Sequence, residues 1–306
     1  MNEKLIYNIA GHTLLIETTN AKTTSRLIPS FKPFETVNAA NAHDATNTNS
    51  FKESDLLFKF SGNSEIEIPN RAPDDAMEID GAFFDVYHIK GGVTVSMKLN
   101  DRNSGNRVHA FTICVNKKIV TSNLTLLQPY ENRFLAYFLR TAFGISSAHH
   151  KTIKLHASVI EKGGRALVFL GKSGTGKSTH SQLWQEFVPG CQLLNDDEPI
   201  VRVMKDGSVR VYGTPWSGST PCYRNAWAEI AAFARLYQSS ENRLIKLKGV
   251  HAFAALLESV ALLRSDSENR QLVIATLNDI LEQSKVYRLD NRPNREAVAL
   301  SQTLMA

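Results

Sequence analysis

Residues 166–178 of this chain read ALVFLGKSGTGKS. The apolar run 166–170 is typical of a buried strand, and residues 171–178 fit the pattern G-x-x-x-x-G-K-[ST]. Glycines let the backbone curl until its N–H groups point at phosphate oxygens, Lys177 can reach the β- and γ-phosphates, and Ser178 can ligate Mg²⁺. An ordinary glycine turn is the alternative interpretation. The complete pattern, placed directly after a strand, favours a nucleotide-phosphate site, which we name the phosphate loop (residues 171–178).

The residues after the phosphate loop predict a helix that runs from Thr179 through Trp184. The positive end of its dipole then faces the bound anion. The residues expected to bind the nucleotide are Gly171, Ser173, Gly174, Thr175, Gly176, Lys177, Ser178 and Thr179.

Two adjacent carboxylates, Asp196 and Asp197, end a second apolar run that begins at Leu193. Aspartate pairs at strand ends commonly cap turns, which is the structural alternative. One helix after a phosphate loop, however, such a pair favours a catalytic role. Phosphoryl transfer needs a ligand for Mg²⁺ and a group that accepts or orients the proton of the nucleophile. Two neighbouring carboxylates can divide these tasks.

Three blocks of sequence carry a family resemblance: LHAS at 155–158, FLGKSGTGKST at 169–179 and LNDDE at 194–198. In order and rough spacing they resemble the kinase family that includes HPr kinase/phosphorylase and shares its nucleotide-binding core with phosphoenolpyruvate carboxykinase. The segment YGTPWSG at 212–218 is similar to one in bacterial proteins labelled HPr-type serine kinases or carboxykinases. The resemblance is strong over residues 153–220, extends more weakly to the C-terminus and is absent before residue 130.

The resemblance implies roles for the polar residues in these blocks. It makes Asp196 the base toward an acceptor hydroxyl and Asp197 the carboxylate on the metal side, with the reverse assignment left open. The carboxykinases use the histidine of their matching block as a ligand for a second divalent metal, which implies a metal role for His156. A hydrogen-bonded packing histidine is the alternative. The expected metal ligands are therefore Ser178, Asp197 and His156.

An arginine often contacts the developing phosphate charge in such sites. Arg224 is our candidate, and with Lys177 and Asp196 it completes the expected catalytic set. The alternatives, which the sequence does not rank, are Arg202, Arg235 and Arg243. Ser219 stands where we expect a lysine in the most similar relatives, which puts activity or acceptor type in question.

An antiparallel hairpin is predicted to lead into the phosphate loop, because strands at 153–160 and 165–170 are joined by the turn KGG at 162–164. In Ras-like NTPases the corresponding strand joins a mostly parallel sheet, so this arrangement favours the carboxykinase-like core. We expect an α/β (α+β) fold with a mixed sheet. The other elements expected in this part are a hairpin at 199–204 and 209–212, strands at 230–237 and 286–289, and helices near 250–263, at 268–283 and from Pro293.

The chain is expected to form two domains, a small β-rich domain at 1–128 and the nucleotide-binding domain at 129–306. The first has short apolar runs between polar turns, with strands expected at 4–9, 13–17, 56–60, 83–89, 93–99, 108–115 and 118–121. We expect it to recognise the acceptor or a partner. Residues 130–143 have apolar side chains at helical spacing and are expected to form a hinge helix. The Asn/Thr/Ala-rich segment 37–50 predicts a loop.

Composition excludes several classes of protein. The 35 basic residues exceed the 30 acidic ones by 5 without a long basic run, which gives no support for nucleic-acid binding. The 3 cysteines are odd in number and lack metal-type spacing, so a disulfide scaffold is excluded and reduced packing residues are expected. The first residues lack the apolar core of a signal peptide, and no apolar run is long enough to span a bilayer. We therefore expect a cytoplasmic protein without a membrane partner.

These observations together predict an ATP-dependent kinase of the HPr-kinase-like type that uses Mg²⁺ or Mn²⁺. Its acceptor would be a serine-type hydroxyl on a protein, a peptide or a small molecule. Carboxykinase-like chemistry on a keto acid is one alternative, although this chain is short for that family. A nucleotide-binding regulator without catalysis is another, and a plain NTPase is a third. Because HPr kinases assemble as hexamers, the resemblance also leaves a homo-oligomer open.

Overall fold

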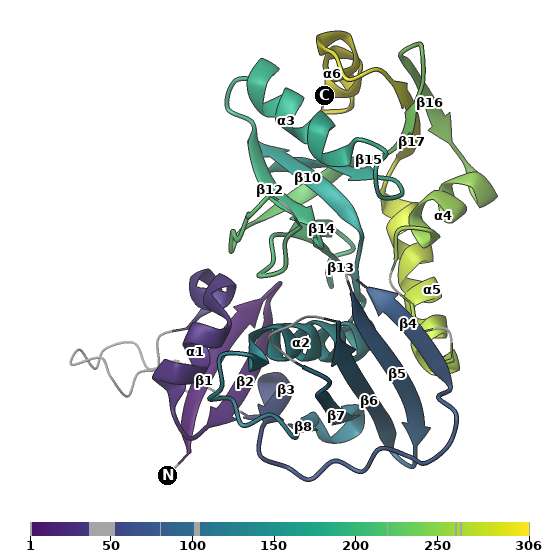
Figure 1. Ribbon diagram of the computed structural model, residues 1–306. Helices are drawn as coiled ribbons and strands as arrows, with labels where there is room; N and C mark the ends of the chain where they lie inside the picture. The colour runs from purple at the N-terminus through teal and green to yellow at the C-terminus, as the bar shows by residue number, and fades with distance from the viewer. Residues whose placement is uncertain are drawn as a thin grey trace. The chain divides into compact units, whose positions relative to one another are not determined.

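The computed structural model describes residues 2–36, 53–79, 81–100, 105–218, 220–260, 262–263 and 265–305. The predicted loop at 37–50 and the position of Ser219 lie outside the described residues. The chain divides into two compact units. The first unit comprises Met1–Ser147 with Leu263–Ser267, and the second comprises Ala148–Leu262 with Glu268–Ala306. Both units combine a mixed β-sheet with helices (Figure 1).

The sheet of the first unit has the strand order β1-β2-β3-β8-β7-β6-β5-β4. Its strands pair antiparallel except at β2–β3 and β3–β8, which are parallel. The predicted strands are confirmed, with ends that differ by at most one residue. Their bounds are β1 (Glu3–Ile9), β2 (His12–Thr18), β3 (Leu56–Ser61), β4 (Asp75–Ile79), β5 (Ala82–Ile89), β6 (Gly92–Leu99), β7 (Val108–Cys114) and β8 (Ile119–Ser122).

Two elements of the first unit have no clear sequence signal. Strand β4 is short and half exposed, and it forms by pairing with β5. Helix α1 (Ala21–Leu27) contains two threonines and no apolar stripe, so its propensity is low. The Asn20 side chain stabilises its start by accepting a hydrogen bond from the Thr23 amide at 2.8 Å. Short 3₁₀ helices are present at η1 (Pro29–Phe34), η3 (Glu53–Asp55) and η4 (Val115–Lys117).

Helix α2 (Glu131–Ser147) belongs to the first unit. The predicted apolar stripe is present and is buried against the sheet, where Phe138 lies 4.8 Å from Phe111 and Phe134 lies 4.6 Å from His109 between ring centroids. The helix expected as a hinge is thus part of the aromatic core of this unit. The division between the compact units accordingly falls after Ser147 and not after residue 128.

The sheet of the second unit has the strand order β12-β10-β11-β15-β14-β13-β9, and β17 pairs with β15 and β16. Strand β15 is parallel to both β11 and β17, while the other neighbours are antiparallel, so this sheet is mixed as predicted. The bounds of the strands are β9 (Thr152–Lys154), β10 (Ala157–Lys162), β11 (Arg165–Leu170), β12 (Gln192–Asp197), β13 (Ile200–Val203), β14 (Val209–Tyr212), β15 (Trp227–Gln238), β16 (Arg243–Leu247) and β17 (Val286–Asn291).

Both predicted hairpins are present, as β10–β11 and β13–β14. The strand expected at 153–160 is instead divided into β9 and β10 by Leu155 and His156. At this break the Leu155 amide donates to Pro199 O at 3.0 Å and the His156 amide donates to Ser259 O at 2.7 Å. The chain changes its pairing partners there, which an apolar run in the sequence does not reveal.

Helices cover both faces of this sheet (Figure 1). Helices α3 (Lys177–Phe187) and α6 (Arg295–Gln302) pack on one apolar cluster around Trp184 and Phe169, while α4 (Gly249–Leu257) and α5 (Ser267–Gln283) pack on another around Val168 and Phe233. Successive residues of β11 therefore enter different cores, as the period of a strand requires. This explains why the strand before the phosphate loop is a continuous apolar run. Two further 3₁₀ helices are η5 (Ala148–His150) and η6 (Thr303–Met305).

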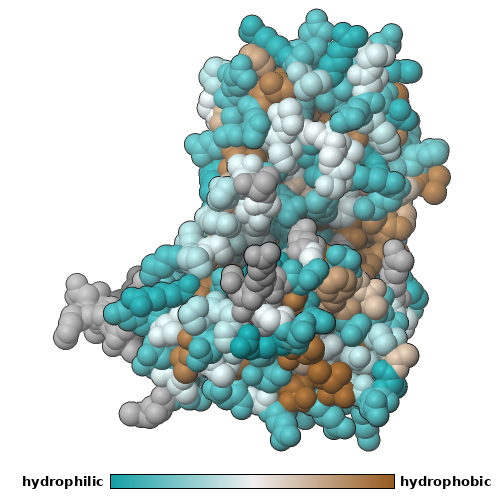
Figure 2. Space-filling view, in the orientation of Figure 1, coloured by the Kyte–Doolittle hydropathy of each residue, from teal (hydrophilic) through white to brown (hydrophobic). Residues whose placement is uncertain are grey.

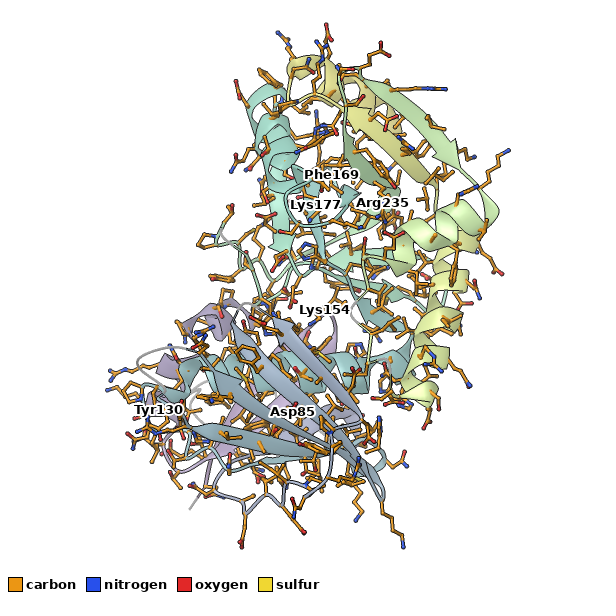
Figure 3. All side chains as sticks on the ribbon, turned by 45° about the vertical axis from the view of Figure 1, so that its right-hand side comes forward. Asp85, Tyr130, Lys154, Phe169, Lys177 and Arg235 are labelled. Carbon is orange, nitrogen blue, oxygen red and sulfur yellow. The ribbon has the colours of Figure 1, made fainter. Side chains whose placement is uncertain are left out.

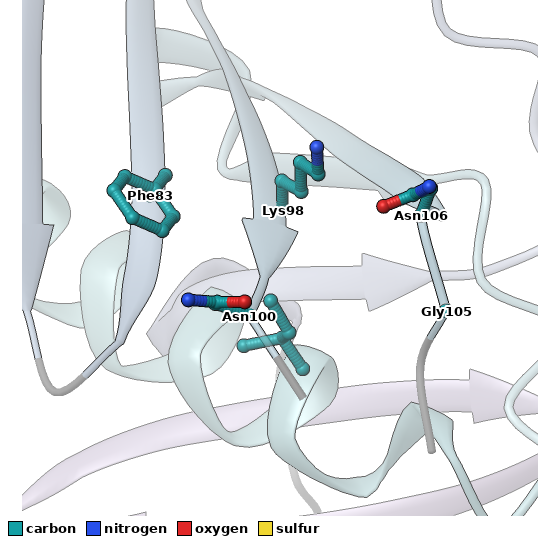
Figure 4. A pocket seen from close by; sticks show the side chains of 6 residues that line it. Phe83, Lys98, Asn100, Gly105 and Asn106 are labelled. Atoms are coloured by element: carbon teal, nitrogen blue, oxygen red, sulfur yellow. The ribbon is translucent and has the colours of Figure 1, made fainter. Parts of the chain in front are cut away.

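No helix among the described residues is long and apolar enough to cross a membrane. Polar residues cover much of the visible surface of each unit (Figure 2). The first unit has a pocket of about 510 Å³ at the end of β5 and β6, where Phe83 and Lys98 stand on neighbouring strands (Figure 4). The residues that line it are Phe83, Lys98, Leu99, Asn100, Gly105 and Asn106. The residues predicted for the site belong to the second unit and line no part of it.

Candidate functional site

The backbone of the phosphate loop needs glycine at defined positions. Gly171 has φ +148°, and a Cβ atom there would lie 2.5 Å from Thr175 Oγ1. Gly176 has φ +95° and is the residue before the first turn of α3. Side chains rarely adopt such angles, so both positions favour glycine. Gln238, at the end of β15, donates from Nε2 to Gly174 O at 3.1 Å and ties the loop to the neighbouring strand.

Lys177 is buried at the start of α3, with 8% of its surface exposed. Its ammonium lies 2.9 Å from Gly171 O, 3.3 Å from Lys172 O and 2.9 Å from His156 Nε2. Burial lowers the pKa of Lys177, and the nearby carboxylates of Asp197 and Asp196 oppose that shift. Figure 3 labels this side chain within the second unit. Each of the three N–H groups of this ammonium therefore has a protein acceptor within reach.

The contact with Lys177 also defines the protonation of His156. An ammonium group donates and cannot accept, so His156 Nε2 must be the acceptor and the ring proton resides on Nδ1. Nδ1 lies 2.9 Å from Asp197 Oδ1, to which it therefore donates. Lys177, His156 and Asp197 thus form one chain of hydrogen bonds. Both ring nitrogens have protein partners, and the structure does not bring His156 to Ser178, the other expected metal ligand.

The two carboxylates at the end of β12 face different partners. Asp196 is 4% exposed and accepts a hydrogen bond from Ser178 Oγ at 3.1 Å. Asp197 contacts His156 and has φ +110°, an angle that costs energy for a residue with a side chain. Successive side chains of a strand point to opposite faces, which explains the separation. Ser178 therefore pairs with Asp196, the reverse of the first assignment made from the sequence.

The segment at 212–218 lies beside the paired carboxylates and holds them in place. Ser217 Oγ donates to Asp196 O at 3.0 Å, and the Gly218 amide donates to the same oxygen at 2.8 Å. The side chain of Asn195 is fully buried and donates from Nδ2 to Trp216 O at 3.0 Å. Sequence reasoning missed the positioning roles of Asn195 and Ser217. The density of glycine and hydroxyl residues in the segment is the signal that could have indicated them.

Arg224 is not brought to the phosphate loop. Its guanidinium donates to Leu193 O at 2.9 Å and lies 3.6 Å from Glu161. Leu193 precedes Asp196 by three residues of a strand, which corresponds to about 10 Å. The site therefore gives no support to Arg224 as the phosphate-contacting arginine.

Arg235, one of the unranked alternatives, lies in β15 directly beside Leu170, the residue before the phosphate loop. It is 5% exposed, with Nη2 2.5 Å from Glu258 Oε2 and Nη1 3.1 Å from Ala255 O (Figure 3). Glu258 precedes Ser259, whose carbonyl accepts from the His156 amide. Arg235 is therefore the arginine that these contacts connect to the site. A single arginine within the apolar run 230–237 was the signal for it in the sequence.

The described residues contain no group of three or more His, Cys, Asp and Glu side chains suited to hold a metal ion. The Ser178–Asp196 pair nevertheless fits one kind of metal site. Mg²⁺ is usually held through one or two protein oxygens together with substrate phosphates and water. A hydroxyl and a carboxylate 3.1 Å apart at the end of a phosphate loop supply such oxygens.

Comparisons with known proteins give limited information. No protein-family model and no curated protein matches the chain. Among solved structures, the chain is similar to the Hpr(Ser) kinase/phosphatase from Coxiella burnetii, with 12% sequence identity and a TM-score of 0.32. The match covers 50% of this chain and 87% of that one. This resemblance is weak, and the geometry described above does not depend on it.

Proposed function

We propose that the second unit binds ATP with Mg²⁺ and transfers the γ-phosphoryl group to a hydroxyl of a protein, peptide or small-molecule acceptor. One observation carries this proposal. The start of α3, the end of β12 and the break between β9 and β10 bring together five residues, which we call the polar cluster: Lys177, Ser178, Asp196, Asp197 and His156. Hydrogen bonds of 2.9 to 3.1 Å link Lys177 to His156, His156 to Asp197 and Ser178 to Asp196. A positively charged loop end, a metal-type oxygen pair and a second carboxylate are the parts that phosphoryl transfer requires.

The contacts favour a division of labour between the two carboxylates. Ser178 and Asp196 would hold Mg²⁺, which would neutralise charge on the phosphates. Lys177 and the loop amides would bind the β- and γ-phosphates. Asp197 would accept the proton of the acceptor hydroxyl as its oxygen bonds to the γ-phosphorus and the bond to the leaving oxygen of ADP breaks. His156 would hold Asp197 in position through the hydrogen bond from Nδ1.

The test is transfer of a radiolabelled γ-phosphate from ATP to acceptors in a native lysate. We expect the wild-type protein to label an acceptor and Asp197→Asn to lose at least a hundredfold of that rate, as removal of a general base does. Asp206→Asn, in the exposed turn between β13 and β14, is the matched control and should retain the rate. Tight MgATP binding by the wild type without any transfer would favour the non-catalytic regulator. Release of label only as free phosphate would favour the plain NTPase.

We further propose that the first unit selects the acceptor or partner. Phe83, Lys98 and Val108 face each other across β5, β6 and β7 and form an exposed row. Phe83 is 43% and Val108 is 46% exposed, and the two flank Lys98 at one end of these strands, so the row offers a partner apolar surface beside a charge. The double change Phe83→Ser and Val108→Ser should reduce acceptor labelling without changing MgATP affinity. Undiminished labelling would contradict this role.

A further inference from the structure

The order of the strands indicates in which direction a bound nucleotide would extend from the phosphate loop. Strand β11, which carries the phosphate loop, has β10 and β12 on one side and β15 and β17 on the other. Asp196 and Asp197 end β12, so they mark the side of the γ-phosphate. A nucleotide bound at the loop would then extend its nucleoside to the opposite side, over the carboxyl ends of β15 and β17. Ligands of α/β sheets commonly lie outside these strand ends.

An exposed aromatic side chain stands at that place. Tyr237 is the next-to-last residue of β15 and is 38% exposed. Its neighbour Gln238 donates to Gly174 O, so this end of β15 meets the phosphate loop, while the Tyr237 side chain points to the other face of the strand, the one on which Arg235 contacts Ala255 of α4. Because β15 is parallel to β11, both strands end at the same edge of the sheet. Tyr237 is therefore an exposed aromatic residue at the sheet edge where β11 runs into the phosphate loop.

An arginine from the next strand lies over the Tyr237 ring. The guanidinium carbon of Arg288 is 4.4 Å from the ring centroid, and that of Arg235 is 5.6 Å away. Arg288 Nε donates to Asp290 Oδ1 at 2.7 Å, which fixes the plane of its guanidinium. A planar cation on an aromatic ring forms a platform on which a heterocyclic base can stack.

We propose that Tyr237 and Arg288 form the binding platform for the heterocyclic base of the nucleotide. This inference rests on the proposed nucleotide site and adds where in that site the base binds. Stacking uses the π-face that every base has, so the platform accepts adenine and guanine alike. Selection between these bases would require hydrogen bonds to their edges, which a tyrosine and an arginine held face to face do not supply.

The same strand contains a matched comparison. Trp227, at the start of β15, is 47% exposed, and the guanidinium carbon of Arg210 lies 4.0 Å from the centroid of its ring. The pair has the same chemistry as Tyr237 with Arg288. It lies ten residues earlier in the strand, about 33 Å from the end that meets the phosphate loop. Trp227 is therefore too far from the loop to contact a nucleotide held there.

The experiment measures binding of MgATP, MgGTP and inorganic tripolyphosphate to three full-length proteins, the wild type, Tyr237→Leu and Trp227→Leu. We expect Tyr237→Leu to weaken binding of both nucleotides about tenfold, the usual effect of losing one stacked base. Tripolyphosphate has no base, so its affinity should stay unchanged and also show that the variant is folded. Trp227→Leu should match the wild type with all three ligands.

Three results would overturn the platform while the phosphate site stands. The first is unchanged nucleotide affinity in Tyr237→Leu, and the second is an equal loss of nucleotide and tripolyphosphate affinity. A wild-type protein that binds tripolyphosphate as tightly as the nucleotides would also refute a base platform. A wild-type protein that binds none of the three ligands would refute the proposed function and the platform with it.

Discussion

Each unit buries a carboxylate, and the two are satisfied in different ways. Glu131, at the start of α2 in the first unit, is 0% exposed and accepts from the amides of Thr125, Leu127 and Gln128 and from the Thr125 hydroxyl at 2.6 to 3.0 Å. Asp196, in the second unit, is 4% exposed and accepts from Ser178, which lies 18 residues earlier on another element.

The difference separates an acid with local structural partners from the acid that we propose to hold Mg²⁺. Four hydrogen bonds from donors within six residues reach the carboxylate of Glu131, one at Oε1 and three at Oε2. Its role is to bind the backbone that turns into α2. Asp196 instead stands among groups from distant elements, with Ser178 on one side and Lys177 and Asp197 close by. Burial alone therefore does not indicate a site, whereas convergence of distant charged groups at strand ends does.

The largest effect is expected when Asp196, the acid proposed to hold Mg²⁺, is neutralised. Asp196→Asn keeps the shape of the side chain but removes the charge that would hold Mg²⁺, so transfer should fall about a thousandfold or more. The Mg²⁺ dependence of nucleotide binding should disappear in the same variant. Glu131→Gln is the matched control and should leave transfer unchanged. Equal losses in the two variants would mean that the distinction between these acids is wrong.

Lys177→Ala should weaken MgATP binding about a hundredfold, because hydrogen bonds from a charged donor to phosphate contribute about 3 kcal/mol. The fold should persist, since the side chain contacts loop carbonyls and His156 and not an apolar core. Calorimetry measures the affinity. Lys172 is an exposed lysine in the same loop, and Lys172→Ala should weaken MgATP binding by less than about tenfold. Unchanged affinity in a folded Lys177→Ala protein would contradict the phosphate-loop assignment.

The features that were predicted correctly follow from local patterns. The strands of both units, the hairpin before the phosphate loop and helix α2 all have periodic apolar residues or a turn between them. The break at His156, strand β16 and the short helix α1 were missed, because each depends on partners that are distant in the sequence or on a single cap.

The site follows the same rule. The phosphate loop could be predicted because its residues are contiguous, and its role stays a prediction, while the structure shows positive φ angles at Gly171, Gly174 and Gly176. The partner of Ser178 could not be predicted, because the choice between Asp196 and Asp197 depends on the face of β12 that each side chain occupies. The arginine beside the loop depends on the parallel pairing of β15 with β11, which no local pattern specifies.

Glu131→Ala should destabilise the first unit by about 3 kcal/mol, because it leaves several buried amide donors without an acceptor. Amide hydrogen exchange in α2 measures this loss. Glu131→Gln retains one acceptor oxygen and should lose about half as much. MgATP affinity should not change in either variant. Unaltered exchange protection in Glu131→Ala would show that these hydrogen bonds do not stabilise the start of the helix.

The smallest effect is expected for His180, a structural residue of the second unit that is close in sequence to the phosphate loop. It follows the phosphate loop in α3 but is 1% exposed, with Nε2 3.0 Å from Ser301 Oγ and its ring against Phe169. Ser301 accepts from Trp184 Nε1 at 2.9 Å and donates to Val298 O, so His180 Nε2 must donate to the hydroxyl. Its Nδ1 is buried and has no hydrogen-bond partner among the described residues. These contacts make His180 a neutral packing residue.

Burial lowers the pKa of His180 to about 4. The unfolded chain, in which histidine has its ordinary pKa of about 6.5, therefore binds the proton first as the pH falls. The stability that neutral His180 provides is complete above that value and is lost progressively between about pH 6.5 and pH 4, with about 2 kcal/mol gone by pH 5. Urea unfolding at pH 8 and pH 5 should show this difference in the wild type, and His180→Gln should lack it. Parallel losses in both proteins would assign the acid sensitivity to other groups, and His180 would then be no structural counterpart to the charged groups of the site.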